Sequence, residues 1–173
     1  QMKTVFAQYL PPAHIERLLL NPAAVSLDGE KKLLTVLFSD IRGFTTIAEQ
    51  LAPHQLKHWL NRVFNVLTAQ IHAHDGTIDK YVGDMVMAFW GAPLADAGHG
   101  QKAVQAALAM QAALDMLNRQ FASEALPLVQ IGIGINSGEM NVGDMGSDFR
   151  RSYTVIGDAV NLASRLEALT TFY

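Results

Sequence analysis

Two aspartates close apolar runs in this sequence, and together they could hold a metal ion. Asp40 ends the run that begins at Val36, and Asp84 stands between the runs 77–82 and 85–90. If these runs form neighbouring strands, both carboxylates project at one edge of a sheet. Two carboxylates about 4 Å apart repel by roughly 4 kcal/mol at an effective dielectric constant of about 20. Such a pair needs a proton or a cation, and hard oxygen ligands suit Mg²⁺ or Mn²⁺, which bridge substrate phosphates.

A glycine-containing turn directly follows the first aspartate. The segment Ile41-Arg-Gly-Phe-Thr45 would place backbone amides where a phosphate could dock. Each aspartate alone also has an ordinary structural interpretation, Asp40 as a helix cap and Asp84 as a turn former. The prediction of a metal site under a nucleotide triphosphate therefore rests on the pair and on the turn beside it.

Three more polar residues could take part in the same chemistry. Asn161 and Arg165 are four apart in a predicted helix and share a face, where they could contact a ribose oxygen and a phosphate as charge develops. A solvated polar face is the competing interpretation. By strict alternation Lys80 shares a strand face with Ile78 and Val82. Its amine then either reaches solvent at an edge or points into a pocket.

The spacing of apolar residues predicts the elements that position these side chains. Strands are expected at 32–39, 77–82, 85–90, 128–137 and 152–156, and the second and third should form a hairpin with a two-residue turn. Helices are expected at 44–51, from 53 to about 74, after Asp96 to about 121, and at 157–170. The polar segment 139–151 is expected to be an arm or long loop. This order predicts an α+β, ferredoxin-like βααββαβ sandwich with an antiparallel sheet, helices mainly on one face and a dimerisation arm.

Residues 1–30 are predicted to precede the folded domain, which we place at 31–173. The amphipathic lead, interrupted by Pro11 and Pro12, fits a linker or transmitter helix from an upstream regulatory domain, or a dimer contact. Packing of this helix on its own domain is an equal alternative.

Composition limits the class of protein. The chain has 173 residues, of which 50% are hydrophobic and 17% charged, with a net charge of −3 and no cysteine. These values fit one globular domain, disfavour a nucleic-acid partner, and exclude disulfides and thiolate metal sites within the sequence. Its longest apolar run, 85–92, is far shorter than the ~18 residues of a membrane-spanning helix. We expect a cytoplasmic domain, in a full-length protein that could be membrane-tethered by a segment outside this sequence.

Three segments in the expected order resemble the class III adenylate/guanylate cyclase catalytic domain. They are Val36-Leu-Phe-Ser-Asp-Ile-Arg-Gly-Phe-Thr45, Lys80-Tyr-Val-Gly-Asp84 and the segment from Tyr153 to Glu167. The resemblance runs from about Lys32 to the end of the sequence. The lead from Phe6 to Pro12 also resembles the segment that precedes bacterial members. Three separate motifs in order make the resemblance specific.

The resemblance assigns a role to each candidate residue. Two Mg²⁺ or Mn²⁺ ions would be held by two carboxylates and a backbone carbonyl, those of Asp40, Asp84 and Ile41. The turn residues Phe44 and Thr45 would lie against the substrate. A lysine and a partner across the dimer would read adenine, and these are Lys80 and Thr154. An asparagine and an arginine would stabilise the transition state, and these are Asn161 and Arg165.

The resemblance also implies the reaction and the assembly. The ribose 3′-oxygen of ATP would attack the α-phosphorus and release pyrophosphate. A head-to-tail homodimer would build two equivalent sites, with Asp40, Asp84 and Lys80 from one protomer and Asn161 and Arg165 from the other. Guanylate cyclases carry glutamate at the position of Lys80, so adenine is favoured. Thr154 places the chain in the threonine-bearing subgroup of bacterial adenylate cyclases, many of which respond to bicarbonate.

Two other functions stay open on the sequence alone. One is a guanylate cyclase. The other is a catalytically silent nucleotide-binding or dimerisation module, although the filled set of candidate positions argues against it. The family domain usually continues past Tyr173 with a lysine that binds the triphosphate, so we expect the C-terminal end of the domain to be incomplete here.

Overall fold

A computed structural model describes residues 9–10, 12–21, 29–147 and 150–171 of the chain. Within these residues one antiparallel sheet has the strand order β2-β3-β1-β4-β5. The strands are β1 (Glu30–Ile41), β2 (Thr77–Val82), β3 (Met85–Trp90), β4 (Ile131–Ser147) and β5 (Arg150–Ile156). The helices are α2 (Pro12–Leu20), α3 (Phe44–Gln50), α4 (Pro53–Ala73), α5 (His99–Ser123) and α6 (Asp158–Leu169).

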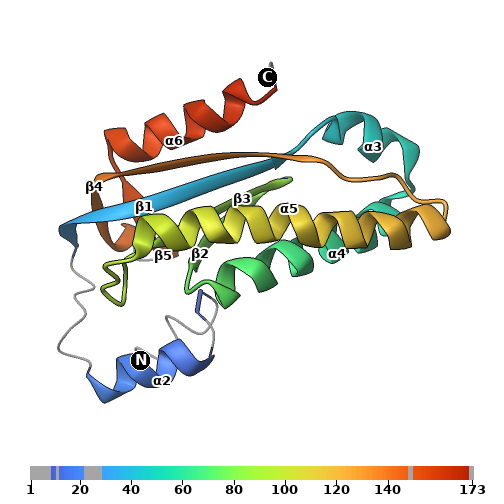
Figure 1. Cartoon of the computed structure of the whole chain (residues 1–173). Coiled ribbons are helices and arrows are strands. Elements are labelled where there is room, and N and C mark those ends of the chain that lie inside the picture. Colours follow the sequence, from blue (N-terminus) through green and yellow to red (C-terminus); the bar gives the residue numbers. More distant parts are fainter. Residues whose placement is uncertain (1–8, 11, 22–28, 148–149, 172–173) are drawn as a thin grey trace.

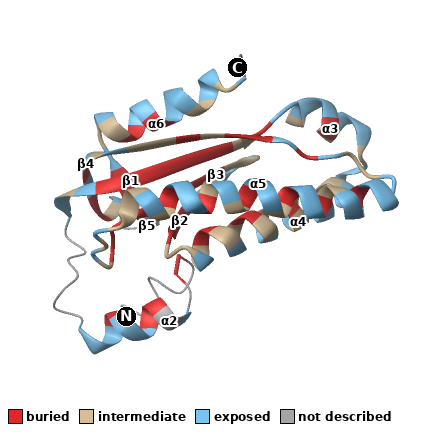
Figure 2. Cartoon of the chain, in the orientation of Figure 1, coloured by how far each residue is buried: buried red, intermediate tan, exposed pale blue. Residues whose placement is uncertain are grey.

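The expected α+β architecture is confirmed, with the two longest helices, α4 and α5, side by side on one face of the sheet (Figure 1). Apolar residues at helical spacing on α4, among them Val63, Leu67 and Ile71, are buried against that face. The opposite face is covered in part, because α6 packs over β4 and β1 and α2 packs against the same apolar cluster. The middle of β1 is therefore buried on both sides (Figure 2).

Two strands are longer than their apolar runs. β1 continues to Ile41, so Asp40 lies within the strand instead of after it. β4 continues through the polar, glycine-rich stretch to Ser147 and pairs with β5, so the expected arm is a two-stranded extension of the sheet over the described residues. Residues 148–149 of that arm lie outside the described part of the chain. The ends of β1 and β4 are set by backbone hydrogen bonds to a neighbouring strand. The apolar pattern of the sequence does not report such pairing.

The helix α2 packs on the domain that follows it. Ile15 and Leu18 are buried, and the backbone carbonyl of Tyr9 accepts a hydrogen bond from the amide of Ile78 at 3.1 Å. Of the interpretations left open by the sequence, the described structure shows packing on the same domain; a role in transmitting a signal stays a prediction. No helix among the described residues is both long enough and apolar enough to cross a lipid bilayer.

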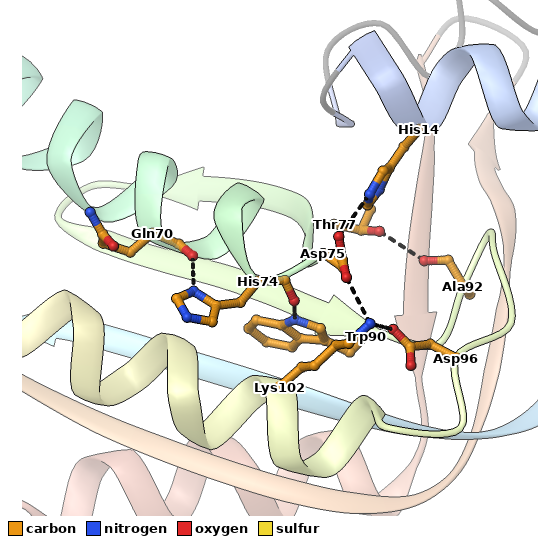
Figure 3. A network of polar contacts seen from close by, with 9 residues as sticks. All are labelled: His14, Gln70, His74, Asp75, Thr77, Trp90, Ala92, Asp96 and Lys102. Atoms are coloured by element: carbon orange, nitrogen blue, oxygen red, sulfur yellow. Dashed lines mark hydrogen bonds and ion pairs between the residues drawn. The ribbon is translucent and has the colours of Figure 1, made fainter.

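A charged network joins α2 to the turn before β2 and to α5 (Figure 3). His14 Nε2 lies 2.9 Å from Asp75 Oδ1, and Lys102 Nζ lies 2.7 Å from carboxylate oxygens of both Asp75 and Asp96. Hydrogen bonds from Lys102 and His14 hold the pKa of Asp75 below its ordinary value, against the opposing effect of burial. Asp75 has a positive φ of 65°, a conformation that asparagine and aspartate tolerate better than most residues.

We predict that Asp75→Asn lowers the free energy of unfolding by less than about 1 kcal/mol at pH 7, because these groups are partly exposed. The substitution keeps the backbone conformation and removes the charge. Since the folded-state pKa is depressed, the stabilisation is present above the ordinary pKa of 3.8 and is lost as the pH falls through the folded value. Denaturant unfolding across this pH range measures it, with exposed Glu49→Gln as a control. A deficit that stays constant with pH would contradict the assignment.

Candidate active site

The structure brings Asp40 and Asp84 together. Strands β1 and β3 are neighbours with Ser39 opposite Val86, so the end of β1 lies beside the turn between β2 and β3. That turn has two residues, and Gly83 adopts the positive φ of 59° that it requires. The backbone amide of Ile41 donates a hydrogen bond to Asp84 Oδ2 at 3.0 Å, and the carboxyl groups of Asp40 and Asp84 lie within hydrogen-bonding reach of each other.

The carboxylate pair carries an excess of negative charge. Burial, the neighbouring carboxyl group of Asp84 and the charge of Glu167 together raise the pKa of Asp40 to about 7, opposed by the backbone amide of Ile41. Burial and Asp84 also raise the pKa of Glu167, which Arg42 lowers. Glu167 is contributed by α6, which lies over the same end of the sheet. A divalent cation at this position would relieve the repulsion.

The ligands of the pair fit a magnesium-type ion. Over the described residues, no three or more acidic, histidine or cysteine side chains are grouped so that they could enclose a metal. Mg²⁺ is usually bound through one or two carboxylates, with water and substrate phosphates completing its shell. A cavity of about 280 Å³ adjoins the pair and is lined by Asp40, Ile41, Arg42, Gly43, Glu167, Thr170 and Thr171. Asp40 therefore borders a space that a phosphate could enter, and Asp84 lies beside it.

The turn residues after Asp40 differ in what they could offer a substrate. Gly43 has a φ of 62° and precedes α3. The side chain of Phe44 packs on the core beneath α4 and α5, whereas Thr45 is exposed. Phe44 can therefore offer a substrate little beyond its backbone, while the hydroxyl of Thr45 is accessible.

Lys80 is not on the face that alternation predicts. A β-bulge falls between Ile78 and Lys80, so Ile78 pairs with Ala88 and Lys80 pairs with Met87. Paired residues share a face, and Ala88 and Met87 belong to opposite faces of the sheet. The extra residue of the bulge, Asp79, thus moves Lys80 to the face opposite Ile78, and the expected arrangement is corrected.

The two base-reading candidates belong to one protomer. The hydroxyl of Thr154 donates to Asp79 Oδ2 at 2.5 Å, and Lys80 Nζ lies 3.7 Å from Asp79 Oδ1. Lys80 and Thr154, expected to face each other across a dimer, are therefore gathered by a single carboxylate within the chain. One sign of this arrangement is visible in the sequence, a second charged residue, Asp79, directly before Lys80 in the strand that carries Ile78.

Asn161 and Arg165 lie on the exposed surface of α6. α6 buries Val160 and Ala163 against the sheet, and Asn161 and Arg165 are exposed on its outer side. Their helical spacing and shared face are as expected. Glu167, which sequence reasoning did not select, is the residue of this helix that lies near Asp40.

The fold and the carboxylate pair are those of a nucleotide cyclase domain, and comparison with known proteins agrees. The chain belongs to the adenylate and guanylate cyclase catalytic domain family, whose sequence model matches residues 28–171. It is 35% identical over 168 residues to "Adenylate cyclase 1" of Rhizobium meliloti (strain 1021), a match that covers 97% of this chain and 25% of that protein. The chain thus spans about a quarter of that relative's length.

Solved structures match at similar levels. The adenylyl cyclase CyaB from P. aeruginosa is 41% identical with a TM-score of 0.78, covering 81% of this chain and 73% of that one. The guanylyl cyclase Cya2 is 39% identical with a TM-score of 0.77, covering 81% and 71%. Overall similarity therefore does not separate the two purine specificities.

We predict that Asp40→Asn stabilises the metal-free chain while removing tight Mn²⁺ binding. The pKa of Asp40 is raised on folding, so its ionisation costs stability as the pH rises from 3.8 through about 7. The gain at pH 8 should be about 1 kcal/mol after allowance for solvent screening, and should vanish near pH 4. Denaturant unfolding in a chelator and Mn²⁺ titration calorimetry measure the two effects. A loss of stability at pH 8 would contradict the assignment.

Proposed function

We propose that this chain is an adenylate cyclase domain, which converts ATP to 3′,5′-cyclic AMP and pyrophosphate. The observation that carries the proposal is the pairing of Asp40, which borders a cavity at the end of β1, with Asp84 of the β2–β3 turn, in a chain of the cyclase family. The curated relative from Rhizobium meliloti bears the name adenylate cyclase, which supports the choice of ATP.

The reaction is an internal displacement at phosphorus. The ribose 3′-oxygen bonds to the α-phosphorus, its proton leaves, and the bond from the α-phosphorus to the oxygen bridging to the β-phosphate breaks to release pyrophosphate. Two Mg²⁺ or Mn²⁺ ions held by Asp40, Asp84 and the carbonyl of Ile41 would supply positive charge for the triphosphate and for the 3′-oxygen. Asn161 and Arg165 donate hydrogen bonds to the ribose and to the phosphate as negative charge develops.

The site requires a second copy of the chain. Asn161 and Arg165 are exposed on α6, which buries Val160 and Ala163, so both side chains are accessible to a second protomer. A head-to-tail homodimer brings them to the carboxylates of the partner and forms two equivalent sites. Exposed apolar residues on α6 and at the adjacent strand end support burial of this surface, namely Ile156, Leu162, Leu166 and Leu169.

Lys80 and Thr154 select the base from a single protomer. An ammonium group donates to a ring nitrogen of adenine, and a hydroxyl oxygen accepts from the 6-amino group. Guanylate cyclase activity is the second candidate, because the guanylyl cyclase Cya2 is nearly as similar to the chain as the adenylyl cyclase CyaB. Lys80 is the residue that favours adenine.

We predict that the chain forms cyclic AMP from ATP and Mn²⁺ and that Asp40→Ala lowers the rate by about 100-fold or more, because a metal ligand is lost. Cyclic nucleotide formation from ATP and from GTP, measured in parallel, checks both the activity and the base. Exposed Glu49→Gln should behave as the unaltered chain. Equal turnover by Asp40→Ala would refute the metal assignment, and faster turnover of GTP would favour the second candidate.

We predict that two inactive variants, Asp40→Ala and Arg165→Ala, restore activity when mixed. Random exchange of protomers makes about half of the dimers mixed, each with one intact site of two, so about a quarter of the unaltered activity should return. A mixture of Asp40→Ala with Asp84→Ala, which lie in the same half-site, serves as the control and should stay inactive. Failure of the first mixture, with protomer exchange shown by differently tagged chains, would rule out the composite site.

A further inference from the structure

Asp79 is a buried carboxylate that the metal and phosphate chemistry does not use. It is the extra residue of the β2 bulge, and its side chain has an exposed fraction of 0%. Burial raises its pKa, because a charge removed from water must be compensated by hydrogen bonds or by an opposite charge. A group this costly to bury has a specific set of partners.

The partners of Asp79 come from the two ends of the sheet. Its Oδ2 accepts the hydroxyl proton of Thr154 at 2.5 Å, the backbone amide of Val155 donates to the same carboxyl group, and Lys80 Nζ lies 3.7 Å from Oδ1. β2 and β5 are the two outermost strands in the sheet order, and this carboxylate links them. Asp79 therefore fixes the relative position of Lys80 and Thr154.

Lys80, Thr154 and Asp79 differ in their accessibility to a ligand. The side chain of Lys80 is 44% exposed, Thr154 is 8% exposed and the side chain of Asp79 is fully buried. A ligand at this surface can touch Lys80 and the edge of Thr154. It cannot touch Asp79, which lies beneath them and acts only through them.

The hydrogen bond to Asp79 removes an ambiguity of the threonine hydroxyl. A free hydroxyl can donate one proton or accept at its lone pairs, so it could serve either purine. The hydroxyl of Thr154, the charge of Lys80 and the backbone amide of Val155 favour the ionised form of Asp79 against burial. An ionised carboxylate can only accept, so the proton of Thr154 is directed at Asp79 and its oxygen offers a ligand lone pairs alone. Adenine carries an amino donor at its 6-position and guanine a carbonyl acceptor. An oxygen that can only accept suits adenine and repels guanine.

We propose that Asp79 is a positioning residue that sets the purine selectivity of this site, by holding the Thr154 hydroxyl as an acceptor and by keeping Lys80 beside it. The proposal rests on the cyclase function proposed above and adds a residue that never contacts the nucleotide. It assigns the discrimination to a three-residue unit within one protomer.

The test is Asp79→Asn in the whole chain, read as the ratio of kcat/KM for ATP to kcat/KM for GTP. A carboxamide can turn its NH₂ toward Thr154, which frees the hydroxyl proton to donate to guanine, so the ratio should fall about tenfold or more. Thr154→Val should lower the ratio as well, and adding Asp79→Asn to it should lower the ratio less than the same substitution does in the unaltered chain, because only the contact with Lys80 is then left to lose.

Asp96→Asn is the matched control. Like Asp79, Asp96 is paired with a lysine, but its side chain is only partly buried and it belongs to the network of Lys102. Its loss should lower stability and leave the ratio unchanged. A ratio unchanged in folded Asp79→Asn, or additive effects in the double variant, would overturn the proposal. If Asp79→Asn does not fold, Thr154→Ser must keep the ratio and Thr154→Val must lose it, and equal ratios overturn the proposal.

The outcome separates this inference from the proposed function. An unaltered chain that prefers ATP, with a ratio insensitive to Asp79→Asn, upholds the cyclase assignment and refutes the positioning role. A chain that forms no cyclic product refutes the activity. The selectivity is then read from the ratio of the equilibrium dissociation constants for ATP and GTP. Equal binding of both nucleotides by the unaltered chain would overturn the selectivity proposal too.

Discussion

Two carboxyl groups of like charge are held side by side where β1 meets the β2–β3 turn, and the architecture around them resists their repulsion. β1 is the central strand, paired with β3 on one side and with β4 along its whole length on the other. The backbone at Asp40 cannot move away from the backbone at Asp84 unless strand pairing of β1 breaks or the two-residue turn opens. The amide of Ile41 offsets part of the charge by donating to Asp84. The sheet therefore fixes the position of the proposed cation site, and the free energy of folding offsets the repulsion between the two carboxyl groups.

The arrangement of the proposed site also depends on the close approach of α6 to the sheet. A Cβ at Gly134 would lie 2.3 Å from the backbone nitrogen of Glu167, so only glycine allows the helix to sit this low over β4. The approach places Glu167 near Asp40 on the inner side of α6 and leaves Asn161 and Arg165 on the outer side. In the proposed dimer, one helix would thus contribute charge to the carboxylate site of its own chain and donors to the site of the partner. Gly132 and Gly134 of β4 both lie where a Cβ would collide with α6 or the residue after it, so they support both halves of the proposed site.

The sequence predicted the bounds of those elements whose ends are marked by local residues such as glycine or proline. The hairpin of β2 and β3 ends where expected because two apolar runs flank a glycine-aspartate turn, and α4 begins at Pro53 as proline at a first helical position indicates. The ends of β1 and β4 were missed because each is fixed by pairing with a neighbouring strand, that of β1 by β4 and that of β4 by β5. The glycine-rich residues of β4 have little strand preference of their own, and a partner strand overrides it.

The face of Lys80 was missed for a different reason. Alternation along a strand holds only while the register is constant, and a single extra residue reverses it for everything that follows. The bulge on β2 coincides with a buried aspartate, which needs donors that an apolar face of the sheet lacks. It obtains them from Thr154 and Val155 on β5, the far edge of the sheet. The residue that makes the alternation argument fail is therefore the one that draws β2 and β5 together. That contact, which no periodicity in the sequence encodes, is what brings together Lys80 and Thr154, the two residues proposed to select the purine.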